Sequence, residues 1–488
     1  MQLTKTNFIQ YLNCPESLWL LKNKPNEYPN GEFSLFLEKL ISEGYEVEEY
    51  AKQLFSTGIN ISESGSPEHT KSIIESDGIV FFQPAFETFK GAFARVDILE
   101  RKNDMTWHLY EVKSSSSIKT DNKHNHLKDA CFQKYVLEEC GYTISQVSII
   151  HINKEYIKNG DIESSELLKV VEVTDDLNNI YSATANEINS ALNFINTNVS
   201  ITNCSCVEKT RNNHCDAFSY FNPEIENHSI YEINRISRKK ISELRELGVI
   251  KISDIPADYK LSEKQQLQVD SNIKKEPIYK KGEIKNTLSA LKFPLHFIDY
   301  ETYPTAIPKV DKLSPHQHLT FQVSIHTLTE SGNLSHYEYL ADKMELPDQL
   351  IQFMMETTGL IGTFISWHAS FEKGRNSDMI ALFPEYENYL NYMNANMFDL
   401  ETLFNTAYMD YRFLGKTSIK NVLPVLNSEF SYNHLEIQNG TMALDTWGRL
   451  VLDPDSFDDI EMVRKNLLAY CKLDTLAMVK IYQKLIKL

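Results

Sequence analysis

The chain has 488 residues, with 49 Lys+Arg against 67 Asp+Glu and a formal net charge of -18. This length predicts two or three domains, and a hydrophobic content of 42% excludes a disordered chain. The acidity excludes a surface that attracts polyanions everywhere, although a locally basic groove remains compatible with it. The sequence has no apolar run of the roughly 18 to 20 residues that span a membrane. Because the start lacks the apolar core of a secretory signal and the seven cysteines are an odd number, we expect a cytoplasmic protein without a membrane partner.

The N-terminal part begins with a helical region, after which strand-like runs follow. Residues 91–99 and Trp107–Lys113 alternate like two paired strands with a polar turn between them. The run 128–140 has helical periodicity, and Val147–Ile152 has the composition of a further strand. The predicted order is therefore β-β-α-β.

Two carboxylates and a lysine fall on the first two of these strands. Glu111 and Lys113 are two residues apart and share one strand face, and strand pairing brings Asp97 beside them. Two acids on one face can hold a divalent cation that activates water, and a lysine can stabilise the negative charge that develops on a phosphate. The E-x-K pattern also occurs by chance, in Glu283-Ile-Lys285. The alternative is a surface salt bridge on a β-hairpin.

The D-x(n)-E-x-K pattern resembles that of the RecB-like PD-(D/E)XK nucleases. Gln133 and Tyr135, on the helix after Lys113, are similar to the Q-x-Y element of that family, which implies that both belong to the site. The family also carries a ligand on its N-terminal helix, where this sequence has Glu48; a solvated acidic helix face is the alternative reading of that residue.

One early cysteine, Cys14, and three late ones, Cys204, Cys206 and Cys215, bracket this segment. The arrangement resembles that of RecB-like nucleases of the iron–sulfur type, which implies a 4Fe–4S cluster on these four residues. The late spacing departs from the family pattern, so a zinc site with His214 as a further ligand is an alternative, and so are unused thiols. We expect the remaining cysteines to be buried packing residues: Cys131, Cys140 and Cys471.

Residues 226–290 differ from the rest in charge. Residues 231–290 hold 13 Lys/Arg and 9 Asp/Glu, a net +4, whereas the remaining chain carries -22. Residues 237–256 have the pattern of a helix that ends at Gly248, followed by a second short element, which resembles a helix-hairpin-helix unit. The alternative is an ordinary solvated helical connector.

The C-terminal part alternates between strands and helices. Phe293–Tyr300, Phe321–Leu328 and Leu360–Trp367 have the composition of strands, and a long helix is expected over Ile460–Ile486. This pattern predicts a mixed α/β domain.

A second acidic constellation is distributed over these elements. Asp299 and Glu301 end an apolar strand on one face, Glu372 begins a helix, and Tyr470 and Asp474 share a helix face at i and i+4. Four acids can hold two cations, one activating water and the other supporting the leaving oxygen. Tyr470 would position the water.

This set resembles the DEDD exonucleases of the DnaQ-like, RNase-H-like fold, in their tyrosine-containing variant. Glu372 departs from the family, which has Asp there, and Asp399 is the substitute candidate. A degenerate scaffold without activity is the alternative. The whole chain resembles an uncharacterised bacterial family that fuses a RecB-like module to a DnaQ-like module. The segments that carry this resemblance are Leu109–Ser115, His296–Thr302, Phe321–His326, Gly415–Pro424 and Tyr470–Met478.

The resulting prediction is an α/β protein with a PD-(D/E)XK domain (1–225), a helical connector (226–290) and an RNase-H-like domain (291–488). The resemblance implies a nuclease that uses Mg²⁺ or Mn²⁺ to hydrolyse DNA, with 3′-5′ exonuclease action at the C-terminal site and a second site in the first domain. It also suggests a role in phage defence or repair. The alternatives are an RNA-processing nuclease and a nucleic-acid-binding or assembly protein with one or both sites inactive.

Overall fold

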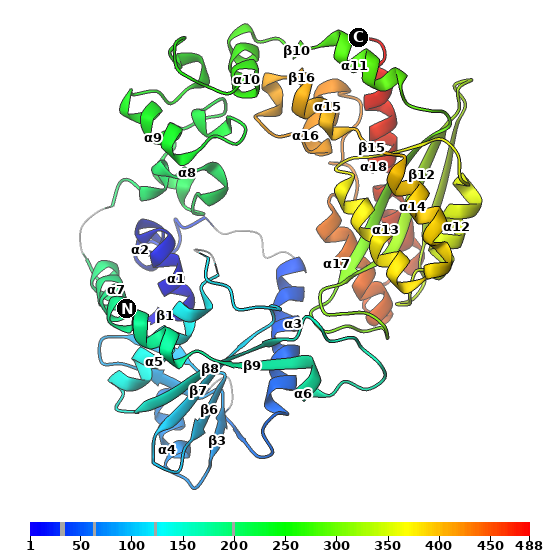
Figure 1. The fold of residues 1–488 in the computed structure, drawn as a ribbon. Helices are drawn as coiled ribbons and strands as arrows, with labels where there is room; N and C mark the ends of the chain where they lie inside the picture. Colours follow the sequence, from blue (N-terminus) through cyan, green and yellow to red (C-terminus); the bar gives the residue numbers. More distant parts are fainter. Residues whose placement is uncertain (30–34, 62–64, 122–123, 198–200) are drawn as a thin grey trace. The chain divides into compact units, whose positions relative to one another are not determined.

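The computed structural model is a mixed α/β protein, as expected from the sequence (Figure 1). No helix in the described part of the chain is both long and apolar enough to cross a membrane. The structure describes residues 1–29, 35–61, 65–121, 124–197 and 201–488.

The chain forms two compact units, and each combines segments that are distant in sequence. Unit 1 consists of Met1–Glu224 and Thr305–His316, and unit 2 consists of Ile225–Pro304 and Gln317–Leu488. The basic segment of the sequence thus folds as part of unit 2.

Unit 1 is built on a six-stranded sheet in the order β2-β3-β6-β7-β8-β9. The central strand β7 pairs antiparallel with β6 and parallel with β8. A separate three-stranded sheet has the order β1-β5-β4. The strands are β1 (Leu3–Thr4), β2 (Ile59–Asn60), β3 (Val80–Phe82), β4 (Ala85–Glu87), β5 (Ala92–Arg95), β6 (Ile98–Arg101), β7 (Trp107–Lys113), β8 (Ile144–Ile152) and β9 (Leu168–Glu172).

Helices cover both faces of this sheet. Residues of α5 and α7 share one hydrophobic core with Leu109 of β7, and residues of α3 share a second core with Tyr110, the next residue along the strand. This alternation follows from the two-residue period of a strand. The order β6-β7-α5-β8 confirms the predicted β-β-α-β succession. The helices are α1 (Lys5–Asn13), α2 (Pro15–Asn23), α3 (Leu35–Lys52), α4 (Pro67–Ile74), α5 (His126–Glu139), α6 (Ser164–Leu167), α7 (Thr174–Ile195) and α8 (Phe218–Phe221).

The run 91–99 differs from the single strand expected. It divides into β5 and β6, which belong to different sheets, and Asp97 lies at the break between them. The break is stabilised by side-chain and backbone contacts, because Val112 N–H donates to Asp97 Oδ2 (2.7 Å) and Gln83 N–H donates to the Asp97 carbonyl (3.1 Å). The interruption therefore directs the Asp97 carboxylate toward β7.

The first part of unit 2 is helical. Helix α9 (Arg238–Glu246) ends before Gly248, which has the positive φ of +74° that favours glycine, and a short 3-10 turn at Ile252–Asp254 follows. This matches the predicted helix and its second short element. Next come α10 (Glu263–Lys274), β10 (Ile278–Tyr279) and α11 (Lys281–Ser289).

The main sheet of unit 2 has the order β13-β12-β11-β14-β15. Strand β12 pairs antiparallel with both β13 and β11, whereas β14 and β15 run parallel to β11. The three strands expected from the sequence are confirmed, and β11 is longer than predicted. The bounds are β11 (Leu295–Pro304), β12 (His318–Leu328), β13 (Leu334–Leu340), β14 (Thr363–Ser366) and β15 (Met397–Asp399); β16 (Tyr408–Met409) pairs with β10.

The two faces of this sheet are covered by different helices. Ile298 and Tyr300 of β11 pack in a core with α12, α13 and α14, and the long terminal helix α18 packs against β11 and β12 (Figure 1). The predicted terminal helix is confirmed with an end one residue earlier. The helices are α12 (Asp348–Thr358), α13 (Ser370–Leu382), α14 (Glu387–Ala395), α15 (Glu401–Thr406), α16 (Ile419–Leu426), α17 (Gly440–Leu452) and α18 (Ile460–Leu485).

Candidate metal centres

The acids of β11 lie on the face of the sheet that α18 covers. Because Ile298 and Tyr300 point into the core beneath α12–α14, Asp299 and Glu301 point to the opposite face. There Cys471 of α18 donates its thiol to Asp299 Oδ2 (3.6 Å). Asp299, Glu301 and Cys471 bring their possible ligand atoms within 4.8 Å of one another. Cys471, expected as a packing residue, is buried but borders this site.

Glu372 and Asp474 complete the acidic cluster, here defined as Asp299, Glu301, Glu372 and Asp474. Glu372 lies in the first turn of α13 and is 2% exposed, while Asp474 lies on α18 and is 7% exposed. Within the described residues, Glu372 Oε2 is a buried oxygen without a hydrogen-bond donor. A buried carboxylate oxygen in that state is costly unless it gains a proton or binds a cation.

Burial favours protonated carboxyl groups throughout the acidic cluster, and repulsion from neighbouring acids adds to this effect at Asp299 and Glu301. Burial, followed by the charges of Asp474, Glu301 and Glu372, raises the pKa of Asp299 well above its ordinary value. Burial also raises the pKa of Asp474 to about 6 and that of Glu372 to about 7. These are the shifts expected where carboxylates share a poorly hydrated site.

Lys420 and two tyrosines border the acidic cluster. Tyr432 donates its hydroxyl to Asp474 Oδ1 (2.5 Å), and Lys420 Nζ lies 3.2 Å from the Tyr470 hydroxyl. Burial and the charge of Asp474 raise the pKa of Glu301 well above its ordinary value, and the Lys420 charge opposes this shift in part. Sequence reasoning placed Tyr470 at this site and missed two residues: Lys420, in the first turn of α16, and Tyr432, in the segment between α16 and α17.

Asp399, the substitute candidate for Glu372, ends β15 beside the turn that follows β14. Its Oδ1 accepts hydrogen bonds from the backbone N–H groups of His368 (3.1 Å) and Glu401 (3.0 Å). These bonds fix the turn after β14, where His368 has a positive φ of +67°. The charge of Asp399 also raises the pKa of Glu372, whose burial is the main cause of its shift. Asp399 therefore supports the loop that leads to Glu372.

The raised pKa of Glu372 predicts a stability effect that depends on pH. The carboxyl titrates near 4.5 in the unfolded chain and near 7 in the fold, so the fold binds the extra proton between these values and wild type loses stability as pH rises through this window. In EDTA, the melting temperature of Glu372→Gln minus that of wild type should increase by roughly 5 to 10 °C between pH 4.5 and 7.5. Calorimetry at several pH values measures this difference. Mg²⁺ should reduce it at pH 7.5, and a difference independent of pH would contradict the assignment.

In unit 1, the structure places Asp97, Glu111 and Lys113 together, and protein cations surround Glu111. Glu111 is fully buried, and its Oε1 lies 2.5 Å from Lys5 Nζ and 2.7 Å from Lys113 Nζ. Gln133 donates to its Oε2. Lys5, which sequence reasoning missed, comes from α1 and is more than a hundred positions away in the chain.

The pKa values of Asp97 and Glu111 are shifted in opposite directions because the surroundings of the two carboxyl groups differ. Loss of water contact and the charge of Glu111 raise the pKa of Asp97 to about 7. Burial alone would raise the pKa of Glu111, but Lys113 and Lys5 hold it below its usual range. Lys113 also pairs with Asp129 (2.5 Å), a partner that the sequence did not indicate.

The two remaining candidates of unit 1 have different surroundings. Glu48 is 9% exposed and accepts a hydrogen bond from Gln83 (2.6 Å), so the alternative reading of a solvated helix face is wrong for this residue. Its charge contributes to the raised pKa of Asp97, after burial and Glu111, which indicates that the two acids are near one another. Tyr135 is buried in the core beside α7, and its hydroxyl donates to Asn189 Oδ1 (3.4 Å).

The four predicted cysteine ligands converge in unit 1. The Sγ atoms of Cys14, Cys204, Cys206 and Cys215 all lie within 4.8 Å of one another, and this four-cysteine cluster could hold a metal. Hydrogen bonding among the thiols lowers the pKa of Cys204 and Cys206 and raises that of Cys14. All seven cysteines lie in the described part of the chain, and none of them forms a disulfide there.

Local structure fixes each of these cysteines. Cys14 separates α1 from α2, and Pro15 starts the second helix. Cys204 immediately precedes a 3-10 turn, and Cys206 lies within that turn. Lys209 donates to the Asn13 carbonyl and thereby joins the two cysteine-bearing segments. His214 stacks on Phe218 (3.6 Å between ring centroids), and its Nε2 forms a hydrogen bond with the Lys209 carbonyl (3.1 Å). These contacts of the ring are with residues other than the four cysteines.

Comparison with known proteins covers part of the chain. Residues 296–418 match a family described as a domain of unknown function (DUF2779). The matched segment contains Asp299, Glu301 and Glu372 and ends before Tyr470 and Asp474.

The chain is also similar to two curated mycoplasma proteins. "Uncharacterized protein MG366" of Mycoplasma genitalium is 25% identical over 220 residues, which are 41% of this chain and 33% of the relative. Its homologue in Mycoplasma pneumoniae is 26% identical over 227 residues, again 41% of this chain and 33% of the relative. The similarity thus spans about a third of each relative's length.

Proposed function

We propose that the chain is a metal-dependent nuclease whose acidic cluster removes nucleotides from the 3′ ends of single-stranded DNA. The observation that carries this proposal is the cluster itself, in which three carboxylates are at most 7% exposed and a fourth is half-buried, and in which burial and the neighbouring acids raise the pKa values of Asp299 and Glu301. Divalent cations would relieve that repulsion and, when bound, supply the activation of water and the stabilisation of the leaving oxygen that phosphodiester hydrolysis needs.

The topology of unit 2 supports the same proposal. Three antiparallel strands followed by two strands parallel to the first, in the order β13-β12-β11-β14-β15, fit the RNase-H-like arrangement that the sequence resembles. The acids come from the first strand, from the helix after β14 and from the terminal helix, in the order Asp299, Glu301, Glu372, Asp474. Glu372, although longer than the Asp of the family, offers an oxygen that lacks a donor in the described structure.

The residues around the acids have distinct proposed roles. Tyr470, one turn before Asp474 on α18, would orient the attacking water through its hydroxyl. Lys420, whose Nζ contacts that hydroxyl (3.2 Å), would hold the tyrosine in place and offset negative charge on the substrate. Tyr432 would fix the rotamer of Asp474 through their hydrogen bond (2.5 Å).

The proposal is tested by incubating the wild-type protein with 5′-labelled single strands of matched DNA and RNA sequence, in Mn²⁺, Mg²⁺ or EDTA. We expect DNA products that shorten stepwise from the 3′ end in either metal and remain intact in EDTA. Preferential RNA cleavage would assign an RNA-processing nuclease, and binding without any cleavage would replace the proposal with a nucleic-acid-binding protein.

For unit 1 we propose a second, PD-(D/E)XK-type nuclease site formed by Asp97, Glu111 and Lys113. Two lysines already compensate Glu111, so this site has less need of a cation than the acidic cluster does. Substrate phosphate could draw Lys113 away from Glu111 and leave that carboxylate to a cation. Gln133 would keep the carboxylate oriented during the exchange.

A lysine substitution distinguishes this second site from the first. In a protein that also carries Asp299→Ala/Glu301→Ala, Lys113→Ala should reduce the remaining Mn²⁺-dependent cleavage of plasmid or linear DNA at least 100-fold. Lys169→Ala is the matched control, since Lys169 pairs with Glu155 at the exposed strand β9. Equal cleavage by both lysine variants, or no cleavage in the starting protein, would count against a second active site.

For the four-cysteine cluster we propose a structural metal. Four sulfurs around one tetrahedral zinc at about 2.3 Å would lie about 3.8 Å apart. An iron–sulfur cubane places iron atoms between its thiolates and therefore needs them farther apart. The sulfur separations of at most 4.8 Å favour a single zinc ion over the 4Fe–4S cluster that the family resemblance implies.

A further inference from the structure

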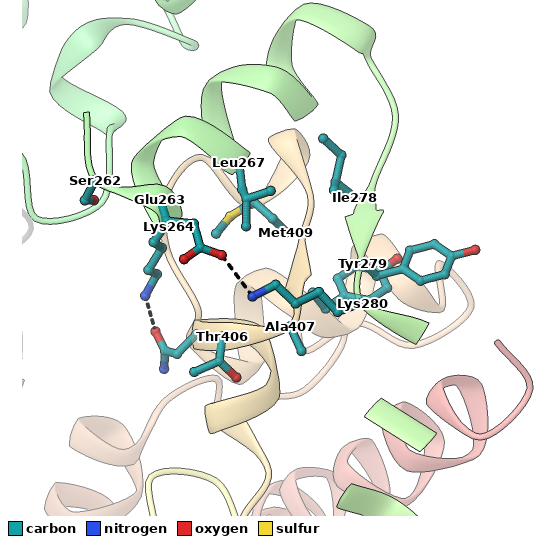
Figure 2. A pocket seen from close by; sticks show the side chains of 12 residues that line it. Ser262, Glu263, Lys264, Leu267, Ile278, Tyr279, Lys280, Thr406, Ala407 and Met409 are labelled. Atoms are coloured by element: carbon teal, nitrogen blue, oxygen red, sulfur yellow. Dashed lines mark hydrogen bonds and ion pairs between the residues drawn. The ribbon is translucent and has the colours of Figure 1, made fainter. Parts of the chain in front are cut away.

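A pocket in unit 2 lies outside the acidic cluster. It has a volume of about 360 Å³ and is formed where α10 and β10 meet α15 and β16 (Figure 2). Its apolar wall includes Leu267, Ile278 and Met409. Lys264, from the first turn of α10, and Lys280 also line it. An apolar wall with cationic side chains suits a ligand that is both flat and anionic.

Two stacked tyrosines form one side of the pocket. Tyr279 of β10 and Tyr408 of β16 are paired across the strands, and their rings stack with centroids 5.6 Å apart and planes inclined by 8°. Tyr408 is buried, whereas Tyr279 is 40% exposed. The buried ring thus holds the exposed ring in a fixed plane. A fixed, accessible aromatic ring is a stacking platform for a nucleic-acid base.

The charge of Lys264 is directed at a neutral partner. Its Nζ donates to the amide oxygen of Asn405 (2.8 Å), whereas Lys280 pairs with the carboxylate of Glu263 (3.1 Å), as the dashed lines in Figure 2 show. Burial and the nearby Arg235 lower the pKa of Lys264, and the charge of Glu401 offsets this only in part, so the Lys264 ammonium would gain from a further anion. A phosphate would supply that charge.

A short helix leads from this pocket toward the loop before Glu372. Asn405, the partner of Lys264, donates to the carbonyl of Glu401 (3.3 Å) at the start of α15. The Glu401 N–H in turn donates to Asp399 (3.0 Å), the residue that supports the loop before Glu372. Helix α15 has six residues and is therefore about 9 Å long, so the pocket and the turn that Asp399 supports lie at the two ends of one short helix.

We propose that this pocket binds one nucleotide of a single-stranded polynucleotide, with its base on Tyr279 and a phosphate on Lys264. The inference rests on the proposed nuclease function and names a place where the substrate strand is held away from the reacting phosphate. It also locates a positive subsite in a protein of net charge -18.

The test measures anisotropy of a fluorescein-labelled oligothymidylate of about 12 nucleotides in EDTA, so that cleavage cannot occur. Lys264→Gln, which retains a donor for Asn405, should weaken binding about tenfold and reduce the salt slope by about one. Tyr279→Ala should weaken binding at least fivefold, and Tyr279→Phe should bind like wild type. Lys274→Gln, which removes an exposed charge from the last turn of the same helix, is the control and should change binding less than twofold. Melting curves establish that the variants are folded.

The outcomes separate the pocket from the nuclease proposal. If Lys264→Gln and Tyr279→Ala bind as Lys274→Gln does, the pocket inference is overturned, even where wild type cleaves in Mn²⁺. If binding depends on Lys264 and Tyr279 but wild type never cleaves, the pocket inference holds and the nuclease proposal fails. A parallel oligouridylate series decides between DNA and RNA, because the strand type with the larger losses is the one that the pocket recognises.

Discussion

Asp299→Ala/Glu301→Ala is expected to lose at least 1,000-fold in Mn²⁺-dependent removal of 3′ nucleotides. These two carboxylates lie on the same face of β11 as possible ligands, and without them neither a cation nor the attacking water has a defined position. The initial rate on 5′-labelled single-stranded DNA is the measurement. The loss should affect the rate at saturating substrate, since strand binding depends on other residues.

The control uses the same spacing elsewhere in the chain. Asp161→Ala/Glu163→Ala removes a D-x-E pair from an exposed loop of unit 1 and should retain wild-type activity. In EDTA, the Asp299→Ala/Glu301→Ala protein should melt at or above the wild-type temperature, because it lacks two mutually repelling acids. An inactive protein that melts far below wild type would show misfolding instead of a missing ligand.

The second large effect is expected from the four-cysteine cluster. Cys206→Ser should release the bound metal and lower the first melting transition by roughly 10 °C or more, since metal bound only by the folded state contributes directly to stability. Elemental analysis of wild type should give one zinc per chain, and a chelator should reproduce the shift. Cys140→Ser, at the end of α5, is the matched control and should keep both metal and melting temperature.

The identity of the metal has its own outcome. Iron and visible absorption near 400 nm in anaerobically purified protein would replace zinc by a cluster on the same four sulfurs. Two results together would contradict a metal site: wild-type protein that contains no stoichiometric metal, and a Cys206→Ser variant that melts at the same temperature as Cys140→Ser.

Short-range patterns accounted for much of the fold. The two-residue period of β11 placed Asp299 and Glu301 on one face, because Ile298 and Tyr300 must fill the core opposite them. The four-residue spacing did the same for Tyr470 and Asp474 on α18. The break in the strand at Asp97 was not predicted, since it depends on a hydrogen bond from Val112, on another strand.

Residues that reach the sites over long sequence distances were the ones missed. Lys5 meets Glu111 only because α1 packs near β7, and Tyr432 meets Asp474 across 42 positions. Neither pair of residues has a sequence spacing that corresponds to a helix or strand period, so a single sequence does not predict these contacts. His214, an alternative ligand by its place beside Cys215, stacks its ring on Phe218 in the fold, a contact that the sequence did not indicate.

The most direct test of the account is a titration with Mn²⁺, monitored by the electron paramagnetic resonance signal of the free ion. The central claim is that the acidic cluster of unit 2 holds divalent cations. Wild type should bind at least one more equivalent of Mn²⁺ than Asp299→Ala/Glu301→Ala, with an affinity that increases between pH 5.5 and 7.5 as protons leave Asp474 and Glu372. Equal uptake by the two proteins at pH 7.5 would contradict the claim.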